Sequence, residues 1–186
     1  DVIITVVENP VSGGINTSGK VVEVVYLAGT EPWAGFFFEL AEKVDFSVYS
    51  TIKVKVYSPA VGHNVNFKLE DKTDASIAKE VQALTTVANE WEELSFDFTG
   101  QESDLFVNIV IIFNQGTVGD GSANATYYFD DIAFATGPIL GCIDESANNY
   151  NESATQDDGS CEYDPEIIEG CTNSTALNYN ENATVD

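Results

Sequence analysis

The sequence predicts an all-β domain, an antiparallel jelly-roll β-sandwich, followed by a short irregular tail of repeats. Three observations predict this fold class. Short runs alternate apolar and polar residues at the strand period of two, turn residues separate the runs, and the first 136 residues show no convincing helical period. About nine short strands of this kind are typical of an antiparallel sandwich.

The first strands follow from simple local patterns. Residues 2–7 form a short apolar run that ends at the turn residues Asn9 and Pro10. Residues 20–27 are rich in valine, a β-branched residue that favours strands. Residues 51–57 alternate cleanly, with isoleucine and valine on one face and lysine and tyrosine on the other.

An aromatic strand is expected at residues 33–40, and it has two apolar faces. Ala34, Phe36, Phe38 and Leu40 lie on one face, and Trp33, Gly35, Phe37 and Glu39 lie on the other. A half-buried strand needs only one apolar face. The second face is therefore either buried under a loop or a platform on which a ligand stacks.

The second half of the domain repeats the alternation. Strands are expected at residues 64–70, 90–99, 105–113 and 127–134. Residues 77–84 are compatible with a weak helix, a strand or a loop, because the spacing of their apolar residues does not distinguish these conformations.

The composition limits the classes of partner. The 186 residues include 31 acidic residues against seven lysines and no arginine, for a formal net charge of -24. Nucleic acid is excluded as a partner, because basic side chains must replace the phosphate counterions. No apolar run reaches the length of a membrane span. No signal peptide is present, so a mature or trimmed chain is expected.

The tail begins near Gly137 and contains an internal repeat. The pattern Gly-Cys, then Ala-x-Asn-Tyr-Asn-Glu-x-Ala-Thr, occurs twice, which suggests the boundaries 1–137, 138–163 and 164–186. Cys142 and Cys161 are expected to pair within the first copy, with a reduced pair as the alternative. The partner of Cys171 is expected after residue 186. Disulfide use indicates an extracellular or cell-surface setting.

Enzyme signatures are missing from the sequence. The only histidine, His63, lies in a turn without a nucleophile motif. The acidic doublets, such as Glu92-Glu93, place adjacent carboxylates on opposite faces of a strand, so no doublet is a catalytic pair by itself. We therefore expect a protein that is not an enzyme, although a parent protein can carry a hydrolase elsewhere.

Two groups of oxygen-bearing side chains indicate calcium. Asp130 and Asp131 interrupt an apolar strand, where an unpaired carboxylate is costly and a calcium ion would neutralise it; a solvated edge carboxylate is the alternative. In the tail, oxygen ligands cluster without a nearby cation. The expected tail ligands are Asp144, Asn149, Asn151, Asp157 and Asp158.

A carbohydrate site is expected from the outward-facing residues of several strands. Aromatic rings stack on the C–H faces of sugars, and amide, ammonium and carboxylate groups bond to hydroxyls. The candidate residues are Trp33, Phe37, Tyr57, Asn66, Lys68, Glu70 and Asn108. Packing of the aromatics under a loop remains the alternative. Trp91, between acidic residues, is expected to be structural.

The order of these segments resembles the β-sandwich carbohydrate-binding modules of the family-four type, as attached to laminarin-degrading enzymes of marine Bacteroidetes. The segments that carry the resemblance are Asn9-Pro10 with residues 14–18, then 33–37, 52–59, 65–70, 91–94 and 128–132. The resemblance implies a jelly roll, a structural calcium held partly by the Phe129-Asp130-Asp131-Ile132 strand, and binding of a β-glucan such as laminarin without catalysis. Such modules usually begin with a strand, upstream of the position of Asp1, that bears a Phe-Glu element whose acidic residue can help to hold the calcium.

The tail resembles the cysteine-containing, thrombospondin-type-3-like calcium repeats of secreted Bacteroidetes proteins, closely over 141–163 and in part over 170–186. This resemblance implies a calcium-stiffened spacer on an exported protein. The expected function is therefore β-glucan binding by one module of a secreted or cell-surface protein. The alternative is a structural module of an adhesin or filament with no glycan ligand. Self-assembly and attachment to other modules of the same chain stay open.

Overall fold

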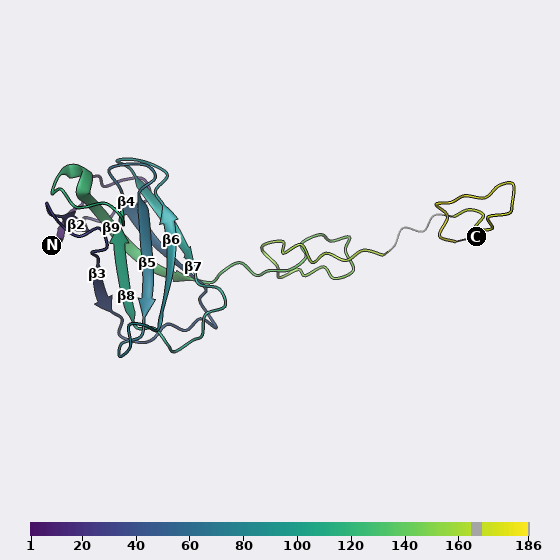
Figure 1. Ribbon diagram of the computed structural model, residues 1–186, viewed down its shortest axis with the longest axis horizontal. Helices are drawn as coiled ribbons and strands as arrows, with labels where there is room; N and C mark the ends of the chain where they lie inside the picture. The colour runs from purple at the N-terminus through teal and green to yellow at the C-terminus, as the bar shows by residue number, and fades with distance from the viewer. Residues whose placement is uncertain (165–168, 186) are drawn as a thin grey trace. The chain divides into compact units, whose positions relative to one another are not determined.

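The computed structural model describes residues 1–164 and 169–185 of the chain (Figure 1). The chain divides into two compact units, Asp1–Gly137 and Pro138–Asp186. Within the described residues, no helix combines the length and the apolar character needed to cross a bilayer.

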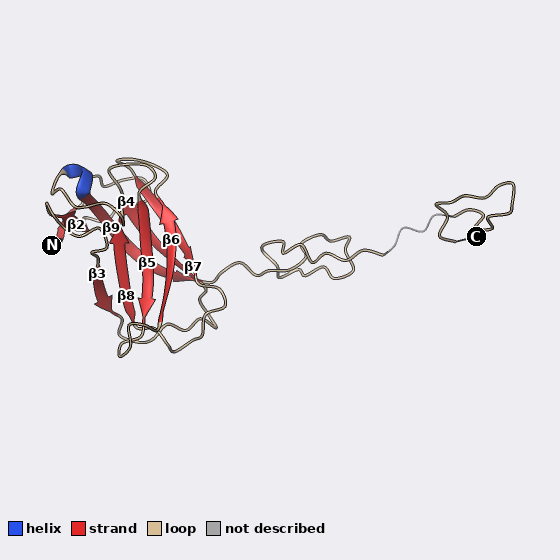
Figure 2. Ribbon diagram, in the orientation of Figure 1, coloured by secondary structure: helices blue, strands red, loops and turns tan. Residues whose placement is uncertain are grey.

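The first unit is an antiparallel jelly-roll sandwich of two sheets, which confirms the expected fold class (Figure 2). One sheet has the strand order β1-β2-β9-β4-β7, and the other has the order β3-β8-β5-β6. The strands are β1 (Val2–Glu8), β2 (Lys20–Tyr26), β3 (Phe36–Glu39), β4 (Thr51–Tyr57), β5 (Asn64–Glu70), β6 (Ala78–Leu84), β7 (Trp91–Asp97), β8 (Asn108–Phe113) and β9 (Thr126–Ala135). A short 3-10 turn, η1 (Ala123–Ala125), precedes β9.

The core lies between the sheets, because the strands turn their alternate apolar residues inward. In β4, Ile52, Val54 and Val56 are buried, while the lysines between them face outward. The rings of Phe67 in β5 and Phe96 in β7 meet across the two layers with centroids 5.0 Å apart. Fully burying side chains of this size contributes about 1.5–3 kcal/mol each, so this interface provides much of the driving force for folding.

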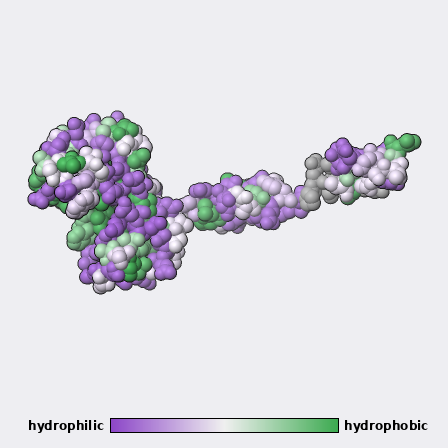
Figure 3. Space-filling view, viewed as in Figure 1, coloured by the Kyte–Doolittle hydropathy of each residue, from purple (hydrophilic) through white to green (hydrophobic). Residues whose placement is uncertain are grey.

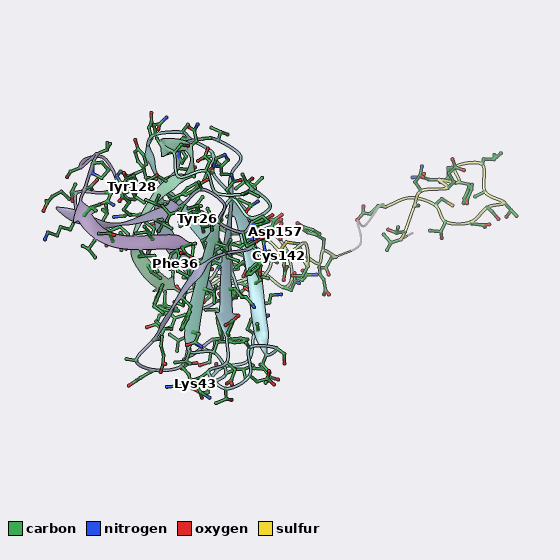
Figure 4. All side chains as sticks on the ribbon, turned by 60° about the vertical axis from the view of Figure 1, so that its left-hand side comes forward. Tyr26, Phe36, Lys43, Tyr128, Cys142 and Asp157 are labelled. Atoms are coloured by element: carbon green, nitrogen blue, oxygen red, sulfur yellow. A yellow bond between two sulfur atoms is a disulfide. The ribbon has the colours of Figure 1, made fainter. Side chains whose placement is uncertain are left out.

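One polar link joins the two sheets inside the core. The backbone N–H of Phe113 in β8 donates to the hydroxyl of Tyr26 in β2 at 2.8 Å. Burial raises the pKa of Tyr26 to about 12, although this hydrogen bond opposes the shift. Figure 4 labels Tyr26 together with Phe36, another core residue, from β3. The link satisfies a backbone donor that would otherwise be buried without a partner.

The segment with the ambiguous pattern is a strand. Residues 78–84 pair with β5 along its whole length, and Val81 and Ala83 pack onto the core. Leu84, which a helix would turn inward with Val81, is instead 55% exposed. Pairing with a complete neighbouring strand therefore determines the conformation that the weak local pattern left open.

The second unit is built from short turns and isolated bridges in its described residues. The disulfide between Cys142 and Cys161 confirms the expected pairing, with the two Cα atoms 4.8 Å apart. The first copy has a bridge between Cys142 and Tyr150, and the second has the equivalent bridge between Cys171 and Tyr179. The repeated sequence therefore adopts the same local backbone twice.

Candidate binding face on the four-stranded sheet

The outer face of the four-stranded sheet carries most of the residues expected to bind carbohydrate. Strand register places Phe37 of β3 beside Val110 of β8, which lies beside Lys68 of β5 and then Glu80 of β6. The next row along the sheet runs from Glu39 through Asn108 to Glu70, and the row on the other side contains Asn66. Phe37, Asn66, Lys68, Glu70 and Asn108 therefore share one face.

The apolar part of this face surrounds Phe37, whose surface is 70% exposed. Val110 is half-buried and Ile112 is buried beside it. In Figure 3, hydrophobic surface gathers in a hollow over the place that β3 and β8 occupy in Figure 1. An aromatic side chain left largely in water beside a hollow is a feature of binding surfaces.

Gly35 allows the chain to approach β8 closely just before Phe37. A Cβ atom at Gly35 would lie 2.6 Å from Cγ1 of Ile112 and 2.7 Å from the carbonyl oxygen of Ile111. No larger residue fits without displacing the backbone of β8. The glycine between the two aromatic residues therefore sets how Phe37 enters the sheet.

Trp33 lies outside β3, in the turn that leads into it. The N–H of Ala34 donates to the carbonyl of Glu31, and the carbonyl of Pro32 accepts from Gly116. These bonds form a turn at the position where the predicted strand, residues 33–40, would begin. Because Trp33 is not part of the strand, the alternation of side chains along β3 does not determine the direction of its side chain. Trp33 is nevertheless 67% exposed and is not packed under a loop.

Asn66 is already bonded within the protein. Its Oδ1 accepts from Nε2 of Gln82 at 2.8 Å, and its Nδ2 donates to Oε1 of Gln115. Its side chain is buried, so it holds two glutamines in place at the edge of the face. Sequence reasoning missed both glutamines, because Gln82 lay in the ambiguous segment and Gln115 in a loop.

The polar part of the face combines ion pairs with one unpaired oxygen. Lys68 Nζ lies 2.5 Å from Glu70 Oε1, and Lys72 Nζ lies 2.6 Å from Glu39 Oε1. Asn108 Oδ1 is buried and has no hydrogen-bond partner among the described residues. Such an acceptor costs about 1–3 kcal/mol unless a donor reaches it.

Tyr57 does not join this face. It lies in β4 of the five-stranded sheet, where its ring meets Tyr128 at 5.6 Å and Trp91 at 5.7 Å. The indole N–H of Trp91 donates to the carbonyl of Val11 at 3.0 Å, so Trp91 fastens the β1–β2 connection to the sheet.

Asp130 and Asp131 lie at an irregularity in β9. The register with β4 shifts between Lys53 and Lys55, and Asp131 has a φ of 47°. Asp131 Oδ2 lies 2.6 Å from Lys55 Nζ, while Asp130 Oδ2 accepts from Asn16 Nδ2 at 3.2 Å. Lys55 therefore neutralises the Asp131 carboxylate, whereas Asp130 receives only an amide hydrogen bond, and calcium at this strand stays a prediction.

Four of the five tail residues expected to bind calcium act as turn caps, and the fifth, Asn149, makes a longer-range bond. Asp144, Asn151, Asp157 and Asp158 each accept, through Oδ1, from the backbone N–H two residues later, and Asn149 Oδ1 accepts from the N–H of Glu162. A hydrogen bond from the Tyr163 hydroxyl lowers the pKa of Asp144, as do the bonds from Ser146. The donor chemistry suits calcium. Across residues 1–164 and 169–185, however, no three acidic, histidine or cysteine side chains converge.

His63 has a packing role. Its Nδ1 lies 2.8 Å from the Tyr127 hydroxyl, and burial lowers the pKa of the imidazole. The backbone N–H of His63 donates to the Thr85 hydroxyl at 3.0 Å, and that hydroxyl donates in turn to the carbonyl of Ala60.

Comparisons with known proteins bear on the fold. No protein-family model matches the chain, and no curated protein matches it. A family 11 carbohydrate-binding module from Clostridium thermocellum, in complex with a β-1,3-1,4-mixed-linked tetrasaccharide, superposes with a TM-score of 0.51 and 14% identity, over 73% of this chain and 83% of that chain. A second family 11 module, from a cellulosomal cellulase of the same organism, gives 0.50 and 14% over 74% and 82%.

A third similar structure is a xylanase fragment. The CBM22-1 and GH10 modules of the C. thermocellum endo-1,4-β-D-xylanase 10B, complexed with xylohexaose, give a TM-score of 0.50 and 17% identity. The match covers 80% of this chain but only 26% of that chain. At these identities the comparisons establish the β-sandwich fold of carbohydrate-binding modules. The family-four assignment and the thrombospondin-type tail stay predictions.

Proposed function

We propose that the first unit is a non-catalytic carbohydrate-binding module that holds a neutral polysaccharide, a β-glucan such as laminarin, on the outer face of its four-stranded sheet. The observation that carries the proposal is Phe37, an aromatic side chain 70% exposed in a row with Val110 and Lys68. The shared sandwich fold supports it, because two of the three similar structures from C. thermocellum were solved with an oligosaccharide.

The residues of the face have complementary roles in this proposal. Phe37 covers the apolar face of a sugar ring, and Trp33 in the adjacent loop provides a second exposed ring. Lys68 and Glu70 present a donor and an acceptor to hydroxyls, and Asn108 lies beside Glu70 in the same row. Asn66 acts indirectly by positioning Gln82 and Gln115.

Charge favours a neutral ligand over an anionic one. The net charge of -24 repels sulfated or uronic-acid polysaccharides. On the face itself, each of two lysines is paired with a glutamate, so neither is free to bind an anion. A neutral glucan avoids this repulsion.

The carboxylates of the face do not suit glycoside hydrolysis. Hydrolysis needs a raised-pKa acid and a second, free carboxylate across the bond. Glu70 and Glu39 are instead each paired with a lysine ammonium group, so neither is a free carboxylate. Binding without catalysis therefore fits the site better than cleavage.

A structural module of a cell-surface adhesin or filament is the second candidate. The observation that favours it is the edge strand β1, where Ile3 and Ile4 are each 45% exposed and Val6 is 66% exposed. Edge strands of this kind pair with strands of other chains. The disulfide between Cys142 and Cys161 favours an extracellular setting for either candidate.

Affinity electrophoresis in laminarin tests the proposal. Phe37→Ala should weaken binding about 10–100-fold, since a buried phenylalanine contributes about 1.5–3 kcal/mol. Trp33→Ala should weaken it as well. The matched control is Tyr49→Ala, which removes an aromatic ring that is 39% exposed and contacts Phe134 of β9, in the other sheet.

The outcomes separate the candidates. Migration of the unaltered chain that is insensitive to laminarin and to a panel of other neutral glycans would reject glycan binding and favour the structural role. Equal retardation of Phe37→Ala and the unaltered chain would reject this face. Sugar released by the chain alone would show that it is a hydrolase.

A further inference from the structure

A row of aromatic side chains crosses the outer face of the other, five-stranded sheet. Trp91 of β7 is the register partner of Tyr57 in β4, and Tyr57 is the partner of Tyr128 in β9. Glu23 of β2 continues the row beyond Tyr128. Figure 4 labels Tyr128, and the row lies on the side of the sandwich opposite to Phe37.

A pocket of about 350 Å³ lies over this row, at the lower end of the volumes of small-molecule sites. Tyr57, Tyr128 and Glu23 line it from the sheet. Pro10, from the β1–β2 connection, and Pro59, directly after β4, also line it. Because proline restricts the backbone, these parts of the wall are preformed, which lowers the entropic cost of binding.

The pocket also offers polar groups that are not used up by the protein. The Tyr128 hydroxyl donates to Glu23 Oε1 at 3.0 Å, which leaves the second carboxylate oxygen to accept from a ligand. The Tyr57 hydroxyl has no hydrogen-bond partner among the described residues. Asn89, another lining residue, has a φ of 58° and is held there by a 2.8 Å bond from its N–H to the carbonyl of Ser58.

Sheet stabilisation alone does not account for this arrangement. Neighbouring rings stabilise a sheet by packing, and the contact between Tyr57 and Trp91 does this, with the indole N–H bonded to the carbonyl of Val11. The part of the row at Tyr57 and Tyr128 is different, because these two rings line a pocket together with Pro10 and Pro59. In addition, the Tyr128 hydroxyl is hydrogen-bonded to the Glu23 carboxylate. Rings beside a free acceptor are the groups that recognise a hydroxylated, neutral ring.

We propose that this pocket is a second saccharide site, which binds a single neutral sugar unit such as the end of a glycan chain. Glu23 and the Tyr57 hydroxyl bond to sugar hydroxyls, and the two tyrosine rings contact the C–H surface. The site does not depend on glycan binding by the Phe37 face. If both sites operate, the module holds glycan on two opposite faces and links separate chains.

Nuclear magnetic resonance of the full chain tests this proposal, with glucose, galactose, mannose and laminaritriose as probes. At least one probe should shift the backbone amide signals of Asn89 and Thr126 in a saturable way. Glu23→Gln keeps the size of the side chain and removes its charge, and it should weaken that binding about tenfold. Tyr57→Phe keeps the ring and should weaken it less.

Phe37→Ala is the control that separates the two sites. Shifts at Asn89 and Thr126 that persist in Phe37→Ala and decline in Glu23→Gln support the second site, whether or not laminarin binds the other face. Absence of saturable shifts at these amides with every probe would overturn the proposal. Shifts in Glu23→Gln that saturate at the same sugar concentration as in the unaltered chain would also overturn it, because this variant retains the packing of the row.

Discussion

At the scale of single residues, Gly35 shows how one position prepares the candidate face. The two exposed aromatics flank a residue that has no room for a side chain, because Ile112 and the carbonyl of Ile111 occupy that space. The requirement is steric, since Gly35 is not among the residues with positive φ. Close packing of the β3 entry onto β8 is therefore built into the sequence at this glycine.

Gly35→Ala should destabilise the first unit by about 1–3 kcal/mol, the usual cost of overpacking. Urea unfolding measures it as a lower midpoint with an unchanged slope. Gly19→Ala is the control, because a Cβ atom there meets nothing within 4 Å and its φ is not positive. Equal midpoints for the two variants would show that β3 moves away from β8 without cost.

The residues of the face could be predicted from the sequence, but their bonding could not. Strict alternation in β5 is enough to place Asn66, Lys68 and Glu70 on one side. The partners of Asn66 come from a neighbouring strand and a loop, and no local pattern encodes which side chains meet there. Tyr57 shows the same limit, because alternation gives a face of β4 but not the sheet to which β4 belongs.

At the scale of elements, the irregularity in β9 explains two acidic residues in an apolar strand. Regular alternation would turn Asp130 or Asp131 inward. The register shift opposite β4 lets Asp131 reach Lys55 and Asp130 reach Asn16 instead. Residue spacing cannot reveal such a shift, since it depends on how the partner strand pairs.

The disulfide should stabilise the first tail repeat without affecting the sandwich. Cys142 and Cys161 are separated by 19 positions, and closing a loop of this size is worth about 3 kcal/mol. The double variant Cys142→Ser/Cys161→Ser should lose hydrogen-exchange protection at Asn151 and Ala154, whose amides bond within the repeat. Amides of β4 and β5 should keep their protection, because they belong to the other compact unit.

Cys171→Ser is the control for that experiment, because Cys171 forms no disulfide in the described structure. It should leave the protection of Asn151 unchanged. Retained protection at Asn151 in the double variant would show that turns alone hold the repeat together. Loss of protection in β4 as well would show that the two units unfold together.

At the scale of the whole molecule, the charge imbalance dominates. With a formal net charge of -24, the acidic side chains repel one another in the folded state. The cross-strand ion pairs oppose this only weakly, since exposed pairs are worth about 0–1 kcal/mol each. Screening should therefore weaken repulsion more than it weakens these pairs, and added salt should stabilise the protein.

Raising sodium chloride from ~0.01 M to ~1 M shortens the Debye length from ~30 Å to ~3 Å. We expect the Tm to rise by about 2–8 °C, which corresponds to about 1–2 kcal/mol for a chain of this size. Calorimetry measures the shift. An unchanged or falling Tm would show that the ion pairs outweigh the repulsion.

Calcium at the same ionic strength separates screening from binding. An ion that binds only the folded state adds stability that grows with its concentration, about 2.7 kcal/mol at a hundredfold excess over Kd. If the oxygen ligands of the tail or of β9 bind calcium, the Tm in calcium chloride exceeds the Tm in sodium chloride of the same ionic strength, and a chelator reverses this difference.

Two variants locate the ion. The double variant Asp157→Asn/Asp158→Asn should reduce the difference in Tm if the tail holds the ion, whereas Asp130→Asn should reduce it if β9 does. Identical melting curves in the two salts would leave the turn hydrogen bonds and the Lys55–Asp131 ion pair as the full role of these acidic residues.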